Sequence, residues 1–186
     1  MQRQSFLQRL VAMPEFGPLV LLIAEIAVFT AINPSFLSPL NVSNTLTFTV
    51  ELGLIALAMT LLMTAGEFDL SVGSVFGFAP VLMWTLFNSG VAPLEISFLI
   101  AMLAAVGIGL FSGFFVTRLK IPSFLVTLGM LLVVRGTALY ITDGFPQRTW
   151  NAAGHWLATA LVGDFHVGPF RIYASLFWFI AAALIL

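Results

Sequence analysis

Three ionisable residues lie inside long apolar stretches of this sequence: Glu25, Glu51 and Arg135. Ionisable groups within a membrane are costly, and they mark proton relays or solute pathways, or they are neutralised at contacts between helices. For Glu51 both interpretations stand, whereas helix packing is favoured for Glu25. Arg135 lies about 10 Å from the end of its stretch. It can therefore snorkel to the interface, pair with Glu51 or face a pathway.

The densest polar stretch is residues 66–74, Gly-Glu-Phe-Asp-Leu-Ser-Val-Gly-Ser, between two apolar runs. Irregular backbone at membrane depth is tolerated only against protein or a water-filled cavity. The stretch therefore predicts a broken-helix region facing a translocation path, with Asp69, Ser71 and Ser74 as candidate lining residues. A second, compatible interpretation is a tight turn in which Asp69 caps the next helix by accepting bonds from its free N–H groups.

The sequence lacks the patterns of several other functions. Lys120 is followed by Ile-Pro and not by Ser or Thr in a Gly-rich phosphate loop, so if transport is driven by ATP, a separate subunit must bind the ATP. There are no cysteines, and His155 and His166 have no acidic companions at ligand spacing, so no metal site is expected. An intramembrane enzyme would need clustered acidic residues, and only Glu67 with Asp69 approaches this. Nor is there a basic patch for nucleic acid.

The composition indicates lipid as the surrounding medium. Hydrophobic residues make up 60% of the chain and charged residues only 8%, against about a quarter in soluble domains; the mean hydropathy is +1.09. Six apolar segments can be marked out: 16–32, 44–65, 71–87, 93–117, 121–142 and 172–186. They are too long and too uniformly apolar for barrel strands. We therefore predict an all-α, polytopic transmembrane helix bundle.

Lysine and arginine predict the orientation. With the N-terminus inside, the inner face receives Arg3, Arg9, Arg118 and Lys120, and the outer face receives Arg148 and Arg171. This excess favours a cytoplasmic N-terminus. Residues 143–170 then form an extracytoplasmic loop, in which 149–162 are expected to make a short interfacial helix with Trp150 and Trp156 at headgroup level.

Two further features concern packing and length. Gly73 with Gly77, and Gly109 with Gly113, place small residues on one helix face, which predicts close helix–helix packing. The last apolar run, 172–186, reaches only about 22 Å, which is short of the hydrocarbon core. We therefore expect residues 1–186 to be a C-terminally truncated part of a single transmembrane domain.

Two motifs resemble the ribose/simple-sugar permease family of bacterial ABC importers. Within residues 54–74, Met59-Thr60 and the stretch 66–74 match the family pattern A-x-G-M-T-x-V-x-x-x-x-G-x-D-L-S-V-G-S, from which Ala58 departs where glycine is usual. Residues 121–130, Ile-Pro-Ser-Phe-Leu-Val-Thr-Leu-Gly-Met, continue to Arg135-Gly136 and are similar to I-P-x-F-I-x-T-L-G-M followed by A-R-G. Two long motifs in the same order make the resemblance specific to the family.

The resemblance implies a subunit of about ten helices in the bacterial inner membrane, of which about six are present here. It implies a second permease subunit, identical or different, and a periplasmic binding protein that delivers a monosaccharide. It also implies a cytoplasmic ATPase that binds ATP and drives alternating access, so that this chain would be neither an enzyme nor the holder of a cofactor. The loop that couples the permease to the ATPase is expected just beyond the last residues given.

A sugar pathway needs polar groups to bind hydroxyls. The candidate lining residues are Asn44, Thr45, Thr47, Thr49, Glu51, Asp69, Ser71, Ser74 and Arg135. Trp150 and Trp156 are candidates for docking the binding protein. For any single residue in these sets, packing or anchoring at the interface is the alternative. A different class of function also stays open: a proton-coupled secondary transporter of a small polar solute, with Glu25 and Glu51 as the relay.

Overall fold

The computed structural model describes residues 12–186. The described chain divides into two compact units. One holds the residues up to Phe48 together with His166–Ile172, and the other holds Thr49–Phe165 together with Tyr173–Leu186.

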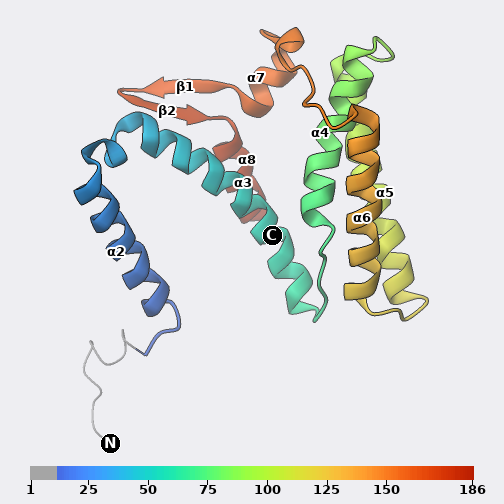
Figure 1. The fold of residues 1–186 in the computed structure, drawn as a ribbon, viewed down its shortest axis with the longest axis horizontal. Coiled ribbons are helices and arrows are strands. Elements are labelled where there is room, and N and C mark those ends of the chain that lie inside the picture. Colours follow the sequence, from blue (N-terminus) through green and yellow to red (C-terminus); the bar gives the residue numbers. More distant parts are fainter. Residues whose placement is uncertain (1–11) are drawn as a thin grey trace, which may run out of the picture. The chain divides into compact units, whose positions relative to one another are not determined.

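Apolar helices dominate both units (Figure 1). They are α2 (Phe16–Ile32), α3 (Pro39–Thr64), α4 (Val72–Asn88), α5 (Leu94–Thr117), α6 (Ser123–Thr142) and α8 (Ser175–Ile185). Of these, α3, α5 and α6 are long and apolar enough to cross a membrane. Each of α2 and α4 has 17 residues, the lower limit for a span. The chain is therefore a multi-pass, all-α membrane protein, and the predicted fold class is confirmed.

The first unit turns sharply between α2 and α3 through the 3₁₀ helix η1 (Pro34–Leu37). The Asn33 side chain caps η1 by accepting a 3.0 Å hydrogen bond from the Ser35 N–H. Asn41 Nδ2 donates to the Phe36 carbonyl at 2.6 Å, and the Phe36 ring stacks on Phe29 with centroids 5.4 Å apart. These contacts join the two helices at their connection.

The second helix begins earlier than predicted. The sequence placed a break at Ser38-Pro39 and the start of the span near Asn44, whereas α3 begins at Pro39 itself. Proline suits the first position of a helix, because the N–H that it lacks would have no partner there and its φ is already helical. The proline therefore starts the helix instead of separating two segments.

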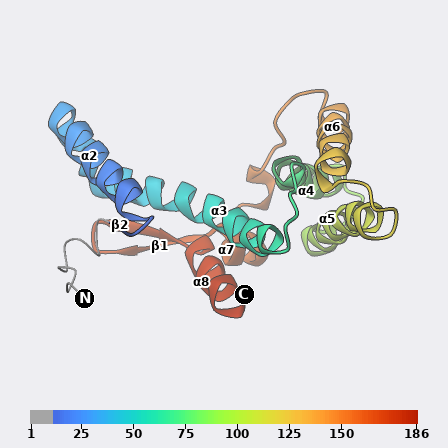
Figure 2. The ribbon, with the colours of Figure 1, turned by 90° about the horizontal axis from the view of Figure 1, so that it is seen from below.

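In the second unit, α4 packs against both α5 and α6 (Figure 2). The side chains buried in these three helices include Phe78, Ser97, Ala101, Thr127 and Val134. Most are small or hydroxylated. This is the pattern expected in lipid, where helices associate by close packing and hydrogen bonds and not by a hydrophobic driving force. The large apolar side chains point outward instead, to the surface that lipid covers.

The turn from α3 to α4 is built by a glycine. Gly66 has φ +79°, a left-handed conformation that glycine adopts without steric cost. Its N–H donates to the Met63 carbonyl at 3.0 Å, and the Glu67 N–H donates to the Leu62 carbonyl at 3.2 Å. These two bonds form a Schellman motif, which satisfies the free carbonyls at the end of α3 and directs the chain toward α4.

The segment after α6 differs from the prediction. It contains η2 (Trp150–Ala152), α7 (Trp156–Val162) and a hairpin of β1 (Asp164–Val167) and β2 (Phe170–Tyr173). The interfacial helix expected over 149–162 is thus reduced to α7 and η2. The last apolar helix begins at Ser175 and not near Ile172, because residues 170–173 pair as a strand with β1.

Candidate translocation site

The two motifs of the sequence meet in the second unit. The Phe68 N–H donates a 3.2 Å hydrogen bond to Oγ of Ser123, the first residue of α6. Ser74 Oγ, in the first turn of α4, donates to the Leu131 carbonyl at 3.0 Å. The polar turn is therefore fixed to the start of α6, and α4 is bonded to α6 two turns further along.

Asp69 stabilises this turn in a different way from the cap that was predicted. Its Oδ1 accepts hydrogen bonds from the Ser71 N–H at 2.7 Å and from Ser71 Oγ at 2.6 Å. Ser71 is the N-cap residue of α4 and is only 1% exposed. The carboxylate thus closes a turn before the helix, and the capping prediction is wrong because none of the first-turn N–H groups of α4 bonds to Asp69.

A cavity of about 620 Å³ lies between α4 and α6. Its walls run from Leu70 to Val81 and from Leu131 to Thr142, and Gly144–Pro146 complete the lining. We call it the α4–α6 cavity. Its volume is within the range of small-molecule sites in proteins.

Glycines make room for this cavity. Gly73 and Gly77 both line it, and a methyl group added to either would meet no atom within 4 Å. The close helix packing that was predicted from this pair is therefore not formed within the described chain. The absence of side chains at the two positions instead leaves space beside α6.

Arg135 and Ser74 are the two candidate pathway residues that the structure brings together at the cavity. Arg135 makes no ion pair with Glu51 in residues 12–186, so the pairing considered from the sequence is not formed there. Thr142, which was not singled out, also lines the cavity, and its hydroxyl donates to the Ala138 carbonyl at 3.0 Å. The guanidinium, two hydroxyls and apolar walls make a surface suited to a small polar solute.

The polar residues of α3 are not gathered at this cavity. Asn44, Thr45 and Thr47 belong to the first unit, where Thr47 Oγ1 donates to the Ser43 carbonyl of its own helix at 3.0 Å. Thr49 and Glu51 belong to the same unit as the cavity but do not line it. A pathway role for these five residues stays a prediction.

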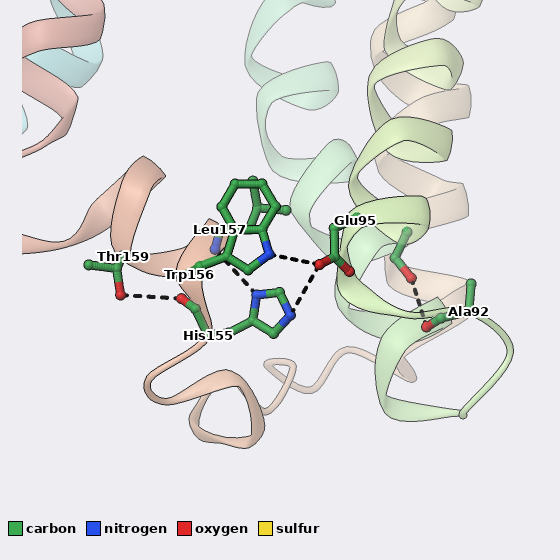
Figure 3. Close-up of polar contacts among 7 residues, drawn as sticks. Ala92, Glu95, His155, Trp156, Leu157 and Thr159 are labelled. Atoms are coloured by element: carbon green, nitrogen blue, oxygen red, sulfur yellow. Dashed lines mark hydrogen bonds and ion pairs between the residues drawn. The ribbon is translucent and has the colours of Figure 1, made fainter.

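A polar cluster joins α7 to the start of α5 (Figure 3). Trp156 Nε1 donates to Glu95 Oε1 at 2.9 Å, and His155 Nε2 lies 3.5 Å from the same oxygen. His155 Nδ1 accepts a 3.3 Å bond from the Leu157 N–H and so caps α7. Because Nδ1 is an acceptor, the imidazole carries its proton on Nε2, facing the carboxylate.

Sequence reasoning missed Glu95, which lies about 60 positions before its partners. A local signal was present, since a carboxylate in the first turn of a helix is favoured by the helix dipole. Trp156 is 63% exposed and remains a docking candidate, whereas the side chain of Trp150 lies outside the described part of the structure. The residues that the structure describes contain no group of three or more His, Asp or Glu side chains that could hold a metal ion.

Comparison with known proteins assigns the family. Residues 41–186 match a family described as the branched-chain amino acid transport system / permease component. The chain belongs to this family. No solved structure matches it.

The permease relatives include several whose names refer to sugars. The ribose import permease protein RbsC of Bacillus subtilis is 37% identical over 134 residues, which are 72% of this chain and 41% of the relative. The xylose/arabinose import permease protein XylH of Sulfolobus acidocaldarius is 32% identical over 62% of this chain and 34% of its own length. The autoinducer 2 import system permease protein LsrC of Photorhabdus laumondii is 34% identical over 70% and 39%. The chain spans about two fifths of these relatives.

Proposed function

We propose that this chain is part of a permease subunit of an ATP-binding cassette importer that carries a monosaccharide across the bacterial inner membrane. The main support for the proposal is that most of the chain matches permeases named for ribose, xylose/arabinose and autoinducer 2. The family's description names branched-chain amino acids. The sugar assignment therefore rests on these relatives and on the two sugar-type motifs.

The chemistry of the α4–α6 cavity fits a sugar. A monosaccharide is rich in hydroxyl groups and has apolar faces of C–H groups, so its path needs hydrogen-bonding groups beside apolar walls. Ser74, Thr142 and Arg135 supply the polar groups, and Phe78 and Phe145 supply aromatic surface. Asp69 and Ser71 would act indirectly. Their polar atoms bond to each other and stabilise the turn from which α4 begins.

The partners follow from the similarity to importer permeases. The residues given contain no phosphate-binding loop, which agrees with a separate cytoplasmic ATPase that would supply the energy, so that this subunit itself would not be an enzyme. A periplasmic sugar-binding protein would dock on the outer segment that includes Trp156, and a second permease subunit would complete the pathway. The N-terminus would face the cytoplasm.

The secondary-transporter alternative has less support. A proton relay through Glu25 and Glu51 needs both carboxylates at one hydrated cavity. Glu51 does not line the α4–α6 cavity, and Glu25 is an exposed residue of α2 in the other unit. No described contact favours the relay.

The test is co-purification followed by an ATPase assay. The complete gene would be expressed with its neighbouring genes and pulled down through a tag on this subunit, and the complex would be placed in lipid. We expect an ATPase to co-elute and its rate to rise when sugar-loaded binding protein is added. A stable permease that recruits no ATPase, or uptake that needs only a proton gradient, would overturn the proposal.

A further inference from the structure

We propose that Arg135 is the ligand-contacting residue of the α4–α6 cavity and that it selects solutes presenting two adjacent oxygen atoms. The inference rests on the proposed transport function and adds a substrate chemistry to it. It starts from the position of the charge. Arg135 is twelve residues into α6 and seven before its end, in a helix apolar enough to span a membrane.

The guanidinium has no partner in the described chain. No hydrogen bond or ion pair of the Arg135 side chain is formed within residues 12–186. Arginine stays charged in proteins and carries five N–H donors. Charged groups within membrane segments pair with other groups or face a water-filled path. The acceptors for this guanidinium must therefore come from water, from a ligand, from another chain or from segments of the protein outside the residues given.

The cavity walls do not offer those acceptors in number. None of the residues lining the cavity is acidic. The hydroxyl protons of Ser74 and Thr142 are directed at the backbone carbonyls of Leu131 and Ala138, which leaves only the oxygen lone pairs of the two hydroxyls. Arg135 is exposed and has no partner within residues 12–186, so a solute that brings oxygen atoms into this space can accept hydrogen bonds from its guanidinium.

The shape of the guanidinium sets the ligand chemistry. Its planar N–H groups bind two neighbouring oxygens at once, whereas a lysine ammonium acts as a point charge without this fork. The adjacent oxygens can come from a vicinal pair of hydroxyls on a neutral sugar or from the carboxylate of a sugar acid. Both sources share the paired-oxygen geometry, and the experiment separates them.

The space beside Arg135 is available for such a ligand. Gly77 lines the same cavity, and a methyl group at this position would meet nothing within 4 Å. A side chain at this position would begin in the cavity, with its first carbon in contact with no atom of the described chain. Gly129 provides a matched control, because it also lies in a helix with nothing within 4 Å of an added methyl group and does not line the cavity.

The experiment uses the complete importer, with its ATPase and binding protein, in proteoliposomes. Uptake of ribose, 2,3-dideoxyribose and ribonate is measured with the binding protein saturated by each solute, so that differences in how tightly the binding protein holds them do not affect the comparison. Wild type is compared with Arg135→Lys, Arg135→Gln, Gly77→Val and Gly129→Val. Assembly of the complex is measured for every variant by co-purification of its subunits.

We expect wild type to prefer a solute with paired oxygens over 2,3-dideoxyribose, which has no vicinal hydroxyls, by about tenfold or more, because an unpaired donor is costly. Arg135→Lys should reduce this preference to about twofold or less while the complex still assembles. Arg135→Gln should abolish uptake of ribonate more completely than uptake of ribose if the carboxylate is the true ligand. Gly77→Val should lower uptake of every solute, and Gly129→Val should leave it unchanged.

Three results would overturn the inference in distinguishable ways. If wild type transports a sugar but Arg135→Lys keeps full discrimination, Arg135 does not contact the solute and the transport function stands. If the Arg135 variants lose a subunit of the complex, the guanidinium pairs with a carboxylate of that subunit. If wild type shows no ATP-dependent uptake of the sugar that its own binding protein carries, the proposed function fails first and this inference fails with it.

Discussion

Ser74 on α4 and Leu131 on α6 are joined by a hydrogen bond of 3.0 Å, from the serine hydroxyl to the backbone carbonyl. The two residues come from the two motifs that identify the family and lie 57 positions apart. In an α-helix the Leu131 carbonyl also faces the N–H of Arg135, one turn later. The bond therefore fixes α4 beside the turn of α6 that carries the guanidinium.

Replacing Ser74 with alanine should loosen this contact. Interhelical hydrogen bonds in membranes contribute about 0.6 kcal/mol on average, and the Leu131 carbonyl keeps its bond within the helix, so we expect a loss of about 0.5–1 kcal/mol. The measurement is thermal unfolding of the purified protein in detergent, followed by tryptophan fluorescence. Ser89→Ala is the control, because Ser89 Oγ bonds only to carbonyls of its own helix. Equal shifts for both variants would show that the interhelical bond contributes nothing.

Replacing Asp69 with alanine should destabilise the turn before α4 more strongly. The change removes the acceptor of both the Ser71 N–H and the Ser71 hydroxyl, and Ser71 is 1% exposed. A buried group left without its partner costs about 1–3 kcal/mol. Asp69→Asn keeps a side-chain oxygen at this position and should cost much less. The unfolding midpoint should thus fall in the order wild type, Asn, Ala.

Two comparisons make the Asp69 test specific. Thr117→Ala removes a hydroxyl that donates to the Gly113 carbonyl of its own helix, so it should move the midpoint little. Ser71→Ala in the Asp69→Ala background removes the orphaned hydroxyl and should recover part of the loss. A midpoint that is the same for Asp69→Asn and Asp69→Ala would contradict the hydrogen-bonding explanation and indicate a role for the charge.

The cluster around Glu95 should hold α7 in place. Trp156→Phe keeps the ring but removes the N–H that donates to Glu95 Oε1 at 2.9 Å. Since this carboxylate is 42% exposed, water competes for it, and we expect the opening equilibrium of α7 to shift by about fivefold or less. Amide hydrogen exchange over residues 156–162 should accelerate by that factor. Thr159→Ala is the control, because its hydroxyl bonds only locally, and equal exchange in both variants would show that α7 is held by other contacts.

The membrane fold was largely predictable from the sequence, because lipid imposes helices on long apolar runs. The cores of the six apolar segments coincide with α2, α3, α4, α5, α6 and α8. The wrong predictions concern helix boundaries, which the length of an apolar run does not determine. Pro39 was taken as a break although it begins a helix, and residues 170–173 were given to a span although they pair with β1.

The site was predictable only in part, for a physical reason. Ser74 and Arg135 were identified because polar groups in apolar helices are costly and therefore conspicuous. The contact of Glu95 with Trp156 depends on how α7 returns to α5, which no local pattern encodes. Gly73 and Gly77 also show that a local sequence pattern does not determine which elements pack together. The four-residue spacing predicted an approaching helix, but in the described chain the two glycines open a cavity.

Gly53 on α3 should accept a larger side chain only at a cost in stability while Phe179 is present on α8. A methyl group at Gly53 would come within 2.7 Å of Phe179 Cε2, and the ring must move to admit it. Overpacking of this kind costs about 1–3 kcal/mol, so Gly53→Val should lower the unfolding midpoint. Gly107→Val on α5 is the control, because nothing lies within 4 Å of that position.

A double variant tests whether the ring is the cause. Phe179→Leu removes the edge of the ring that Gly53 approaches, so Gly53→Val should cost less in the Phe179→Leu background than in wild type. Residues in contact show coupling energies of about 0.5 kcal/mol or more, whereas independent sites add within the error of the measurement. Additive effects of the two substitutions would mean that the contact between Gly53 and Phe179 does not hold α3 against α8, and that valine at Gly53 acts through α3 alone.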